Sequence, residues 1–193
     1  MITSVADFAF LNEDPVIVAQ RLLGCDIVRE LNGRRLVGRI VETEAYHQSD
    51  AASHSYKGRT PRTDIMFGPA GFLYVYFTYG MHYCMNVVTG VEGEGSAVLI
   101  RALEPLEGVE YMQENRHGQS GAGVTNGPAK LCQALVVDKA LNGHDLYQKP
   151  LQLQIQPAIP AKNVVQTTRI GISKAQDQPW RFYISGNAYI SRP

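Results

Sequence analysis

The sequence lacks the features that mark secreted, disulfide-bonded or membrane-spanning proteins. Its 193 residues include only three cysteines, which are widely spaced and form no CxxC pair. An odd number of isolated cysteines favours buried free thiols in a reducing compartment over a disulfide framework or a zinc site. No apolar run approaches the roughly 20 residues that a transmembrane helix needs. The N-terminus, MITSVADFAF, lacks the basic and apolar regions of a secretion signal. We therefore expect an intracellular protein without a membrane segment.

The sequence also lacks an excess of either charge, because lysine plus arginine equals aspartate plus glutamate, at 18 each. Any binding to nucleic acid would therefore need a local basic face. Without an internal repeat or a linker, we expect one domain over residues 1–193. Tryptophan is scarce, with one residue, whereas tyrosine is abundant, with ten residues against six phenylalanines. Tyrosine combines a stacking face with a polar rim, which suits a site for a planar polar ligand.

The N-terminal quarter of the chain predicts a helix followed by a β-hairpin. Residues 11–24, LNEDPVIVAQRLLG, have the composition of a helix that Asn12 can cap. Two β-rich runs follow over residues 25–46, joined by Asn32-Gly33. An Asn-Gly pair between two such runs is the strongest short signal for a hairpin.

The rest of the chain alternates predicted loops, strands and short helices. Residues 47–70 are polar and predict a long loop, whereas FLYVYFTYGMHYCMNVV has strand composition, with a turn that lifts Tyr79 towards a hairpin tip. Residues 96–114 predict a strand followed by a helix, with Pro105 early in that helix. A glycine-rich loop over 113–127 precedes a short helix at PAKLCQAL, and LQLQIQ and WRFYIS predict strands. These patterns indicate a mixed, strand-dominated domain.

Two glutamates interrupt a run that otherwise suits a buried strand, IVETEAYHQS at residues 40–49. Glu44 falls near the exit of the strand, where a sheet can fix a side chain and the loop beyond can admit substrate. The residues alone leave a solvated or salt-bridged role open beside a catalytic one. For Glu42, on the same face by parity, we expect a structural or solvent-facing role. Metal ligation by Glu44 with His47 and His54 lacks any familiar spacing.

Several long blocks match one known family in order. VETEAY, TPR, MFGPAGFLYVYFTYGMHYCMN, LIRALEPLEG, GPAKLCQAL and PWRFYISG together resemble the alkyladenine (3-methyladenine) DNA glycosylase family, over essentially the whole chain. The resemblance implies a base excision repair enzyme that removes alkylated or deaminated purines by hydrolysing the bond between base and deoxyribose. Because that bond is unreachable in a stacked duplex, the nucleotide must be flipped into a pocket.

The resemblance has further implications for fold and partners. The expected fold is mixed α/β (α+β): a single domain with a curved, largely antiparallel sheet, surrounding helices and a protruding β-hairpin. The expected partner is double-stranded DNA that contains damaged purines. We expect no cofactor and no metal, because water is the nucleophile, and a monomer, because reading one lesion needs no symmetry. The absence of a long N-terminal extension suggests a bacterial member, placed in the cytoplasm.

The resemblance also implies roles for particular residues. Glu44 would orient and deprotonate the attacking water and stabilise the oxocarbenium-like sugar. Arg101 would lie close to that water, and the backbone carbonyl of Ile172 would be its other anchor. Tyr79 would intercalate and fill the gap that the flipped nucleotide leaves. The base pocket would comprise Tyr46 and His54 on one face of the base, Tyr76 on the other, and Asn86 to reject guanine. Contacts to the DNA backbone or around Tyr79 are expected from Lys57, Arg59, Thr60, Arg62, Met81 and His82.

Other classes remain open beside this reading. The chain could be a damage reader that keeps the pocket without catalysis, although the pair Glu44 and Arg101 would then be unnecessary. It could also act on RNA or a free nucleoside, for which the wedge Tyr79 would have no gap to fill. Strand cleavage would need an amine at the sugar. Lys130 is the nearest candidate in the matched motifs, and a helix-surface or phosphate-contacting role suits it better, so we expect a monofunctional enzyme.

Overall fold

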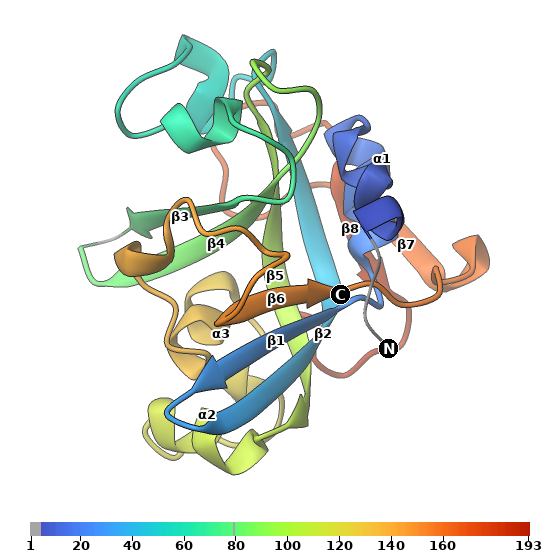
Figure 1. The fold of residues 1–193 in the computed structure, drawn as a ribbon. Helices are drawn as coiled ribbons and strands as arrows, with labels where there is room; N and C mark the ends of the chain where they lie inside the picture. The colour runs from blue at the N-terminus through green and yellow to red at the C-terminus, as the bar shows by residue number, and fades with distance from the viewer. Residues whose placement is uncertain (1–4, 79) are drawn as a thin grey trace.

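A large antiparallel sheet organises the chain, of which the computed structural model describes residues 5–78 and 80–193 (Figure 1). The strands in these residues are β1 (Asp26–Leu31), β2 (Arg34–His47), β3 (Leu73–Thr78), β4 (His82–Val88), β5 (Ser96–Glu107), β6 (Leu151–Gln154), β7 (Val164–Thr167) and β8 (Arg181–Ile184). The α-helices in the same residues are α1 (Pro15–Leu22), α2 (Val109–Asn115) and α3 (Pro128–Ala134). The expected mixed α/β fold is confirmed.

The long strand β2 is the axis of the sheet. The strands follow the order β3-β4-β5-β2-β1-β6, and each of these pairs is antiparallel. β5 lies along one side of β2, while β1 and then β8 lie along the other side. β3 and β4 form a hairpin at one edge of the sheet, as Figure 1 shows. Hydrogen bonds from both sides therefore fix the backbone of β2 around Glu44.

The first α-helix begins later than its sequence pattern predicts. Asp14 is the N-cap, and its side chain accepts a hydrogen bond of 2.8 Å from the backbone N–H of Val16. Pro15 occupies the first turn, where its missing N–H costs nothing. The predicted cap, Asn12, instead ends a preceding 3-10 helix, and its amide donates to the carbonyl of Ala9. The cap prediction was wrong because the sequence offers two capping residues two positions apart, and only Asp14 directly precedes the proline.

The predicted β1–β2 hairpin is confirmed. Leu31 pairs with Arg34, so the connection has two residues, and Asn32 and Gly33 adopt φ values of 51° and 75°. Two consecutive positive φ values are the conformation that Asn-Gly tolerates and most other pairs avoid.

Pro105 lies in a strand, which corrects the prediction that placed it in a helix. It faces Gly38 in the register of β5 with β2, and α2 begins only at Val109, after Gly108 with φ 70°. Among the described residues, β4 pairs only with the beginning of β5, so the other edge of β5 is free at Pro105. A proline, which has no N–H to donate, is tolerated at such an edge.

The remaining elements agree in part with the pattern. α3, β6 and β8 fall where short elements were predicted, whereas the predicted loop over residues 47–70 contains two one-turn 3-10 helices, His54–Lys57 and Asp64–Phe67. β7 was not predicted. The cysteines are buried and free, as expected. Among the described residues, no helix is both long and apolar enough to span a bilayer.

Candidate active site

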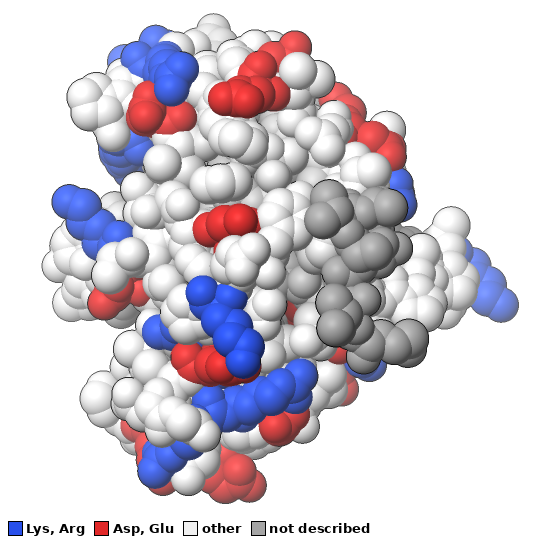
Figure 2. Space-filling model, viewed as in Figure 1, with Lys and Arg blue, Asp and Glu red and all other residues white. Residues whose placement is uncertain are grey.

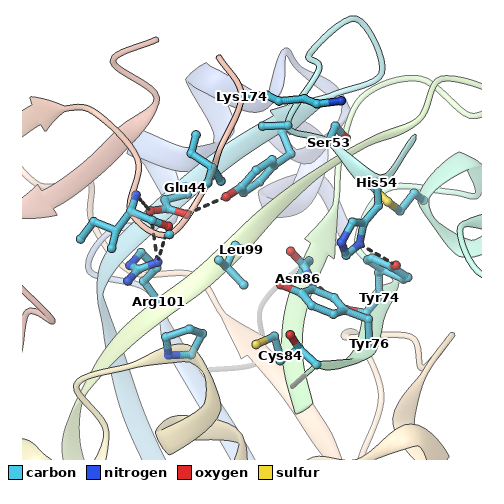
Figure 3. Close-up of a pocket in the computed structure, with 18 of the residues that line it drawn as sticks. Glu44, Ser53, His54, Tyr74, Tyr76, Cys84, Asn86, Leu99, Arg101 and Lys174 are labelled. Atoms are coloured by element: carbon cyan, nitrogen blue, oxygen red, sulfur yellow. Dashed lines mark hydrogen bonds and ion pairs between the residues drawn. The ribbon is translucent and has the colours of Figure 1, made fainter. Parts of the chain in front are cut away.

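A pocket of about 630 Å³ opens between the exit of β2, the β3–β4 hairpin and the segment that precedes β8 (Figure 3). Its volume lies within the range of roughly 300–1,000 Å³ that is usual for small-molecule sites. The structure brings eight of the residues named from the sequence to the wall of this pocket: Glu44, Tyr46, His54, Arg62, Tyr76, Asn86, Arg101 and Ile172. Residues more than 100 positions apart in the chain therefore meet around one cavity.

Glu44 is the buried acid of the pocket, and donors surround both of its oxygens. The Tyr46 hydroxyl donates to Oε2 at 2.8 Å. The backbone N–H of Ile170 donates to Oε1 at 2.8 Å, and Nη1 of Arg101 lies 3.2 Å from the same atom. The side chain of Glu44 lines the pocket and is fully buried. These contacts fix its rotamer and hold the carboxylate at the pocket wall.

An irregularity in the sheet places Arg101 beside Glu44. In the register of β2 with β5, Glu42 faces Ala102 and Thr43 faces Ile100, so Arg101 has no partner residue. Such a bulge bends the strand and re-aims the side chain of the extra residue. The guanidinium of Arg101 consequently reaches both acids of β2, with Nε 3.3 Å from Oε1 of Glu42.

Glu42 has a structural environment, and the solvent-facing alternative is wrong. It is fully buried and accepts a hydrogen bond of 2.7 Å from Nε of Arg181. The backbone N–H and the hydroxyl of Ser191 donate to its two oxygens at 2.6 and 2.9 Å. Glu42, Glu44, Arg101 and Arg181 thus form a cluster in which two carboxylates balance two guanidinium groups.

The electrostatics of Glu44 suit a base that works near neutral pH. Burial raises the pKa of Glu44, and the charge of Glu42 raises it further. Arg101, the Ile170 N–H and the Tyr46 hydroxyl act in the opposite direction and favour the ionised form. Burial and the neighbouring carboxylate raise the pKa of Tyr46 well above its ordinary value, so its hydroxyl keeps its proton and donates. A carboxylate whose pKa lies above the ordinary range is a stronger base.

Aromatic rings form the opposite wall. Figure 3 shows Glu44 and Arg101 across the pocket from His54, Tyr74 and Tyr76. The rings of His54 and Tyr76 meet edge to face with centroids 4.6 Å apart. At this separation the two rings are in direct contact, with no space for a base between them. Nδ1 of His54 lies 3.0 Å from the Tyr74 hydroxyl. Partial burial and the nearby Arg62 lower the pKa of His54 to about 4, so the ring is neutral at pH 7.

Asn86 contributes a buried amide to the pocket. It lies on β4 opposite Tyr74, and its Nδ2 donates to the carbonyl of Tyr74 at 3.1 Å. This bond fixes the plane of the amide, so its orientation towards the pocket does not depend on a ligand. In Figure 3 it lies near Leu99 and Cys84.

The segment before β8 supplies groups that sequence reasoning did not find. The backbone of Ile170 contacts both Glu44 and Arg101, whose Nη1 donates to the Ile170 carbonyl at 3.5 Å. Ile172 also lines the pocket, and its carbonyl accepts a hydrogen bond from Gln176. No spacing rule indicates which carbonyl of an irregular segment will point at a site, so no sequence signal could have separated these two positions.

Arg169 was also missed, and it ties this segment to β2. Its guanidinium forms a buried ion pair with Asp50, with Nη2 3.1 Å from Oδ1, and donates to the carbonyl of Ala45 at 2.9 Å. The guanidinium also lies over the ring of Tyr46, 4.6 Å from its centroid. Arg169 therefore holds both Tyr46 and the neighbouring Ile170 in place.

The residues predicted to contact the DNA backbone lie outside the pocket wall, with the exception of Arg62. Arg62 lies over the ring of Tyr76, 5.9 Å from its centroid, and Arg59 pairs with Asp64. Lys57 is exposed, and Met81 exposes 70% of its surface beside the start of β4. The backbone N–H of Thr60 donates to the Thr63 hydroxyl, and His82 opens β4. The predicted wedge, Tyr79, lies outside the described residues.

On the face that Figure 2 shows, basic and acidic side chains lie interspersed, so this view presents no broad basic patch.

The metal alternative finds no support in residues 5–78 and 80–193, where no three His, Cys, Asp or Glu side chains come together as ligands. Glu44 is surrounded by hydrogen-bond donors instead.

Comparison with known proteins agrees with the geometry. The family model of methylpurine-DNA glycosylases matches residues 9–188. The chain belongs to this family. It is therefore a DNA glycosylase, a hydrolase of N-glycosyl bonds that acts in DNA repair.

Curated relatives match over nearly their whole length. The chain is 53% identical over 184 residues to a protein of Carboxydothermus hydrogenoformans, covering 95% of this chain and 96% of that one. It is 50% identical over 187 residues to a protein of Methanoculleus marisnigri, covering 95% and 97%. A protein of Desulfitobacterium hafniense is 48% identical over 195 residues, covering 94% and 96%. All three relatives are provisionally named 3-methyladenine DNA glycosylases.

Proposed function

We propose that this DNA glycosylase binds duplex DNA, flips a damaged purine nucleotide into the pocket and hydrolyses the N-glycosidic bond with a water that Glu44 activates. The product is an abasic site in an unbroken strand. The observation that carries the proposal is the ionisable carboxylate of Glu44, buried among fixed donors and facing an aromatic wall across a cavity large enough for a purine.

The groups around Glu44 fit a water-activating base. A water between the carboxylate and the sugar would bond to C1′ through its oxygen and give a proton to Glu44, while the bond from C1′ to the purine nitrogen breaks. The electron pair of that bond leaves with the base. The negative charge of Glu44 also stabilises the oxocarbenium-like sugar. The carbonyl of Ile170, which already accepts from Arg101, is close enough to Glu44 to be a second acceptor for the same water. Ile172, two residues further along, also lines the pocket, and its backbone carbonyl is the alternative acceptor for this water.

The aromatic residues would hold the flipped base. Tyr46 belongs to the Glu44 side of the pocket through its hydrogen bond, whereas His54 and Tyr76 contact each other on the other side. A purine would therefore stack with Tyr46 on one face and with His54 and Tyr76 on the other. Electron-rich rings on both faces favour a cationic purine. The fixed amide of Asn86 would crowd the exocyclic amine of guanine. The labile glycosidic bond of cationic 7-methylguanine can react despite this penalty, whereas that of normal guanine cannot.

The titration of the pocket points to alkylated purines as the preferred substrates. A purine that alkylation has made cationic leaves as a neutral base and needs no proton. A neutral lesion needs one, and neither candidate acid supplies it readily, because Tyr46 retains its proton and His54, with a pKa of about 4, is neutral at pH 7. The names of the relatives, which specify 3-methyladenine, agree with this preference.

The proposal includes DNA contacts outside the pocket. Flipping leaves a gap in the duplex, and Tyr79, at the connection between β3 and β4, would fill it. Met81 and His82 follow Tyr79 and would flank it. The remaining contacts, to phosphates, would come from the loop between β2 and β3, through Lys57, Arg59, Thr60 and Arg62.

We further propose that the enzyme does not cleave the strand. A lyase needs an amine near C1′. The ammonium of Lys130 is held by Asn126, with Nζ 2.7 Å from Oδ1. Lys174 is exposed at the edge of the pocket (Figure 3), where a phosphate would lie within its reach.

The experiment is a single-turnover assay on a labelled duplex with one 7-methylguanine. We expect release of free 7-methylguanine, and strand breaks only after treatment with an abasic-site endonuclease. Borohydride added during the reaction should trap no covalent complex. Breaks without the endonuclease, together with a trapped complex that Lys130→Ala or Lys174→Ala abolishes, would replace the monofunctional assignment. Tight binding without release of any methylated purine would favour a damage reader.

A further inference from the structure

We propose that Glu42 is a positioning residue for the hydrolysis: it shares Arg101 with Glu44 and thereby keeps Glu44 a strong base. This inference rests on the proposed role of Glu44. It assigns a function to a carboxylate that touches neither the cavity nor, in the proposed complex, the DNA, because Glu42 is fully buried and absent from the pocket wall.

The geometry of Arg101 is the first observation. Its guanidinium lies between two carboxylates, with Nε 3.3 Å from Oε1 of Glu42 and Nη1 3.2 Å from Oε1 of Glu44. The side chain is only 10% exposed, so water cannot screen either interaction effectively. The negative charge of Glu42 on the same guanidinium partly offsets the stabilisation that Arg101 gives to the ionised form of Glu44.

The second observation is that other partners hold the side chain of Glu42 in place. Arg181 donates to it at 2.7 Å, and Ser191 donates both its N–H and its hydroxyl. Ser191 also accepts from Nε of Arg101, at 3.4 Å. The segment after β8 thus wraps back over the sheet and holds Glu42 against Arg101. Arg181 also pairs with Glu42, so Arg101 is one of two guanidinium groups that contact this carboxylate.

The third observation concerns the charge that develops in the reaction. The sugar becomes positive in the transition state, and an unbalanced guanidinium next to Glu44 would oppose that change. Glu42 balances Arg101, so Arg101 can orient Glu44 and the water without adding net positive charge beside C1′. A buried ion cluster contributes little to stability compared with apolar residues of similar volume. Stability alone therefore does not explain this cluster, and a functional role does.

The other groups that act on Glu44 do not supply this effect. Tyr46 on β2 and the Ile170 N–H both favour ionisation of Glu44, as Arg101 on β5 does. Tyr76 on β3 faces the pocket with its proton retained, because burial raises its pKa. Arg181 on β8 pairs with Glu42, and Arg169 pairs with Asp50. Among these described neighbours, Glu42 is the group whose charge opposes ionisation of Glu44.

The test compares the pH dependence of single-turnover release of 7-methylguanine in wild type, Glu42→Gln and the double variant Glu42→Gln with Arg181→Met. The double variant removes one charge of each sign and guards against misfolding from an unbalanced Arg181. The acid limb of the rate profile is the pH range in which the rate falls as Glu44 is protonated. We expect this limb to move to lower pH by about one unit in both variants, because a like charge near Glu44 is lost. We also expect the plateau rate to fall severalfold, with the affinity for lesion DNA within twofold of wild type.

A purely structural Glu42 would give a different result. Melting temperature and the fraction of active enzyme would fall, and the acid limb of the folded protein would stay where it is in wild type; that outcome in the double variant would overturn the inference. If neither variant folds, Ser191→Ala replaces them, since it keeps every charge and frees Glu42 to draw Arg101 away from Glu44. The limb should then move up, and an unmoved limb would equally overturn the inference.

Glu44→Gln, run in the same assay, separates the two levels of the account. If this variant still releases the base, Glu44 is not the catalytic base and the proposed function fails. If it is inactive while the Glu42 variants show an unmoved limb, only the role of Glu42 fails.

Discussion

The hydroxyl of Tyr46 offers a way to shift the catalytic base without removing it. Tyr46→Phe deletes the donor that lies 2.8 Å from Oε2 of Glu44. The ring remains, so stacking on Arg169, at 4.6 Å, and the proposed contact with the base are both kept. Since the hydroxyl favours the ionised form, its loss should raise the pKa of Glu44 above a value that burial has already raised.

The size of this shift follows from the energies of the two hydrogen bonds. A hydrogen bond to a charged group contributes about 1.5–3 kcal/mol, and one to a neutral group about 0.5–1.5 kcal/mol. The difference of roughly 1–1.5 kcal/mol corresponds to about one pH unit. Because Glu44 must be ionised to act as the base, activity is lost as pH falls. In Tyr46→Phe this loss should occur at a pH about one unit higher than in wild type. Well below the limb the variant should be about tenfold slower than wild type, while at the plateau the two should be similar.

The assay is single-turnover release of 7-methylguanine across pH, with the exposed Glu94→Gln as a control for added mutation. A 7-methylguanine leaving group needs no protonation, so the acid limb reports the base. An unmoved limb, or one that moves to lower pH, would refute the reasoning that the Tyr46 hydroxyl stabilises an ionised Glu44. A plateau that falls as far as the acid limb would instead show that Tyr46 acts mainly by binding the purine.

Two further predictions concern stability. Asp50→Ala leaves the buried guanidinium of Arg169 without its counter-charge, and urea denaturation should show a loss of about 3–5 kcal/mol; a loss under 1 kcal/mol would mean that water replaces the carboxylate. Val136→Gly should leave stability unchanged or raise it by up to about 1 kcal/mol. Val136 has φ 51° and follows the C-cap residue of α3, where the N–H of Val137 donates to the carbonyl of Cys132 at 2.8 Å. A left-handed conformation costs a branched residue about 1–2 kcal/mol, part of which the entropy of glycine offsets. Clear destabilisation in thermal unfolding would show that the exposed valine side chain packs better than its conformation indicates.

Local rules predicted those parts of the fold that depend on neighbouring residues. Asn32 and Gly33 demanded positive φ values and therefore a two-residue turn. Residues whose structure depends on distant partners were misjudged or missed. Pro105 is a residue type that is common in the first turn of a helix, yet pairing of β5 with β2 keeps it in a strand.

The site shows the same division. Glu44 and Arg101 could be named from motifs, and the structure places them in contact. The buried pair of Arg169 with Asp50 joins positions 119 residues apart, a proximity that no local spacing encodes. The arrangement of His54 against Tyr76 likewise results from the packing of a loop on a strand, so its geometry follows from the folded chain alone.

The central claim is that Glu44 acts in the chemical step and contributes little to binding. The most direct measurement pairs two quantities for Glu44→Gln on the same 7-methylguanine duplex: the dissociation constant and the single-turnover rate of base release. The account predicts an affinity within about tenfold of wild type and a rate at least about a hundredfold lower, the contribution typical of a general base. A rate close to that of wild type, or equal losses in affinity and rate, would contradict it.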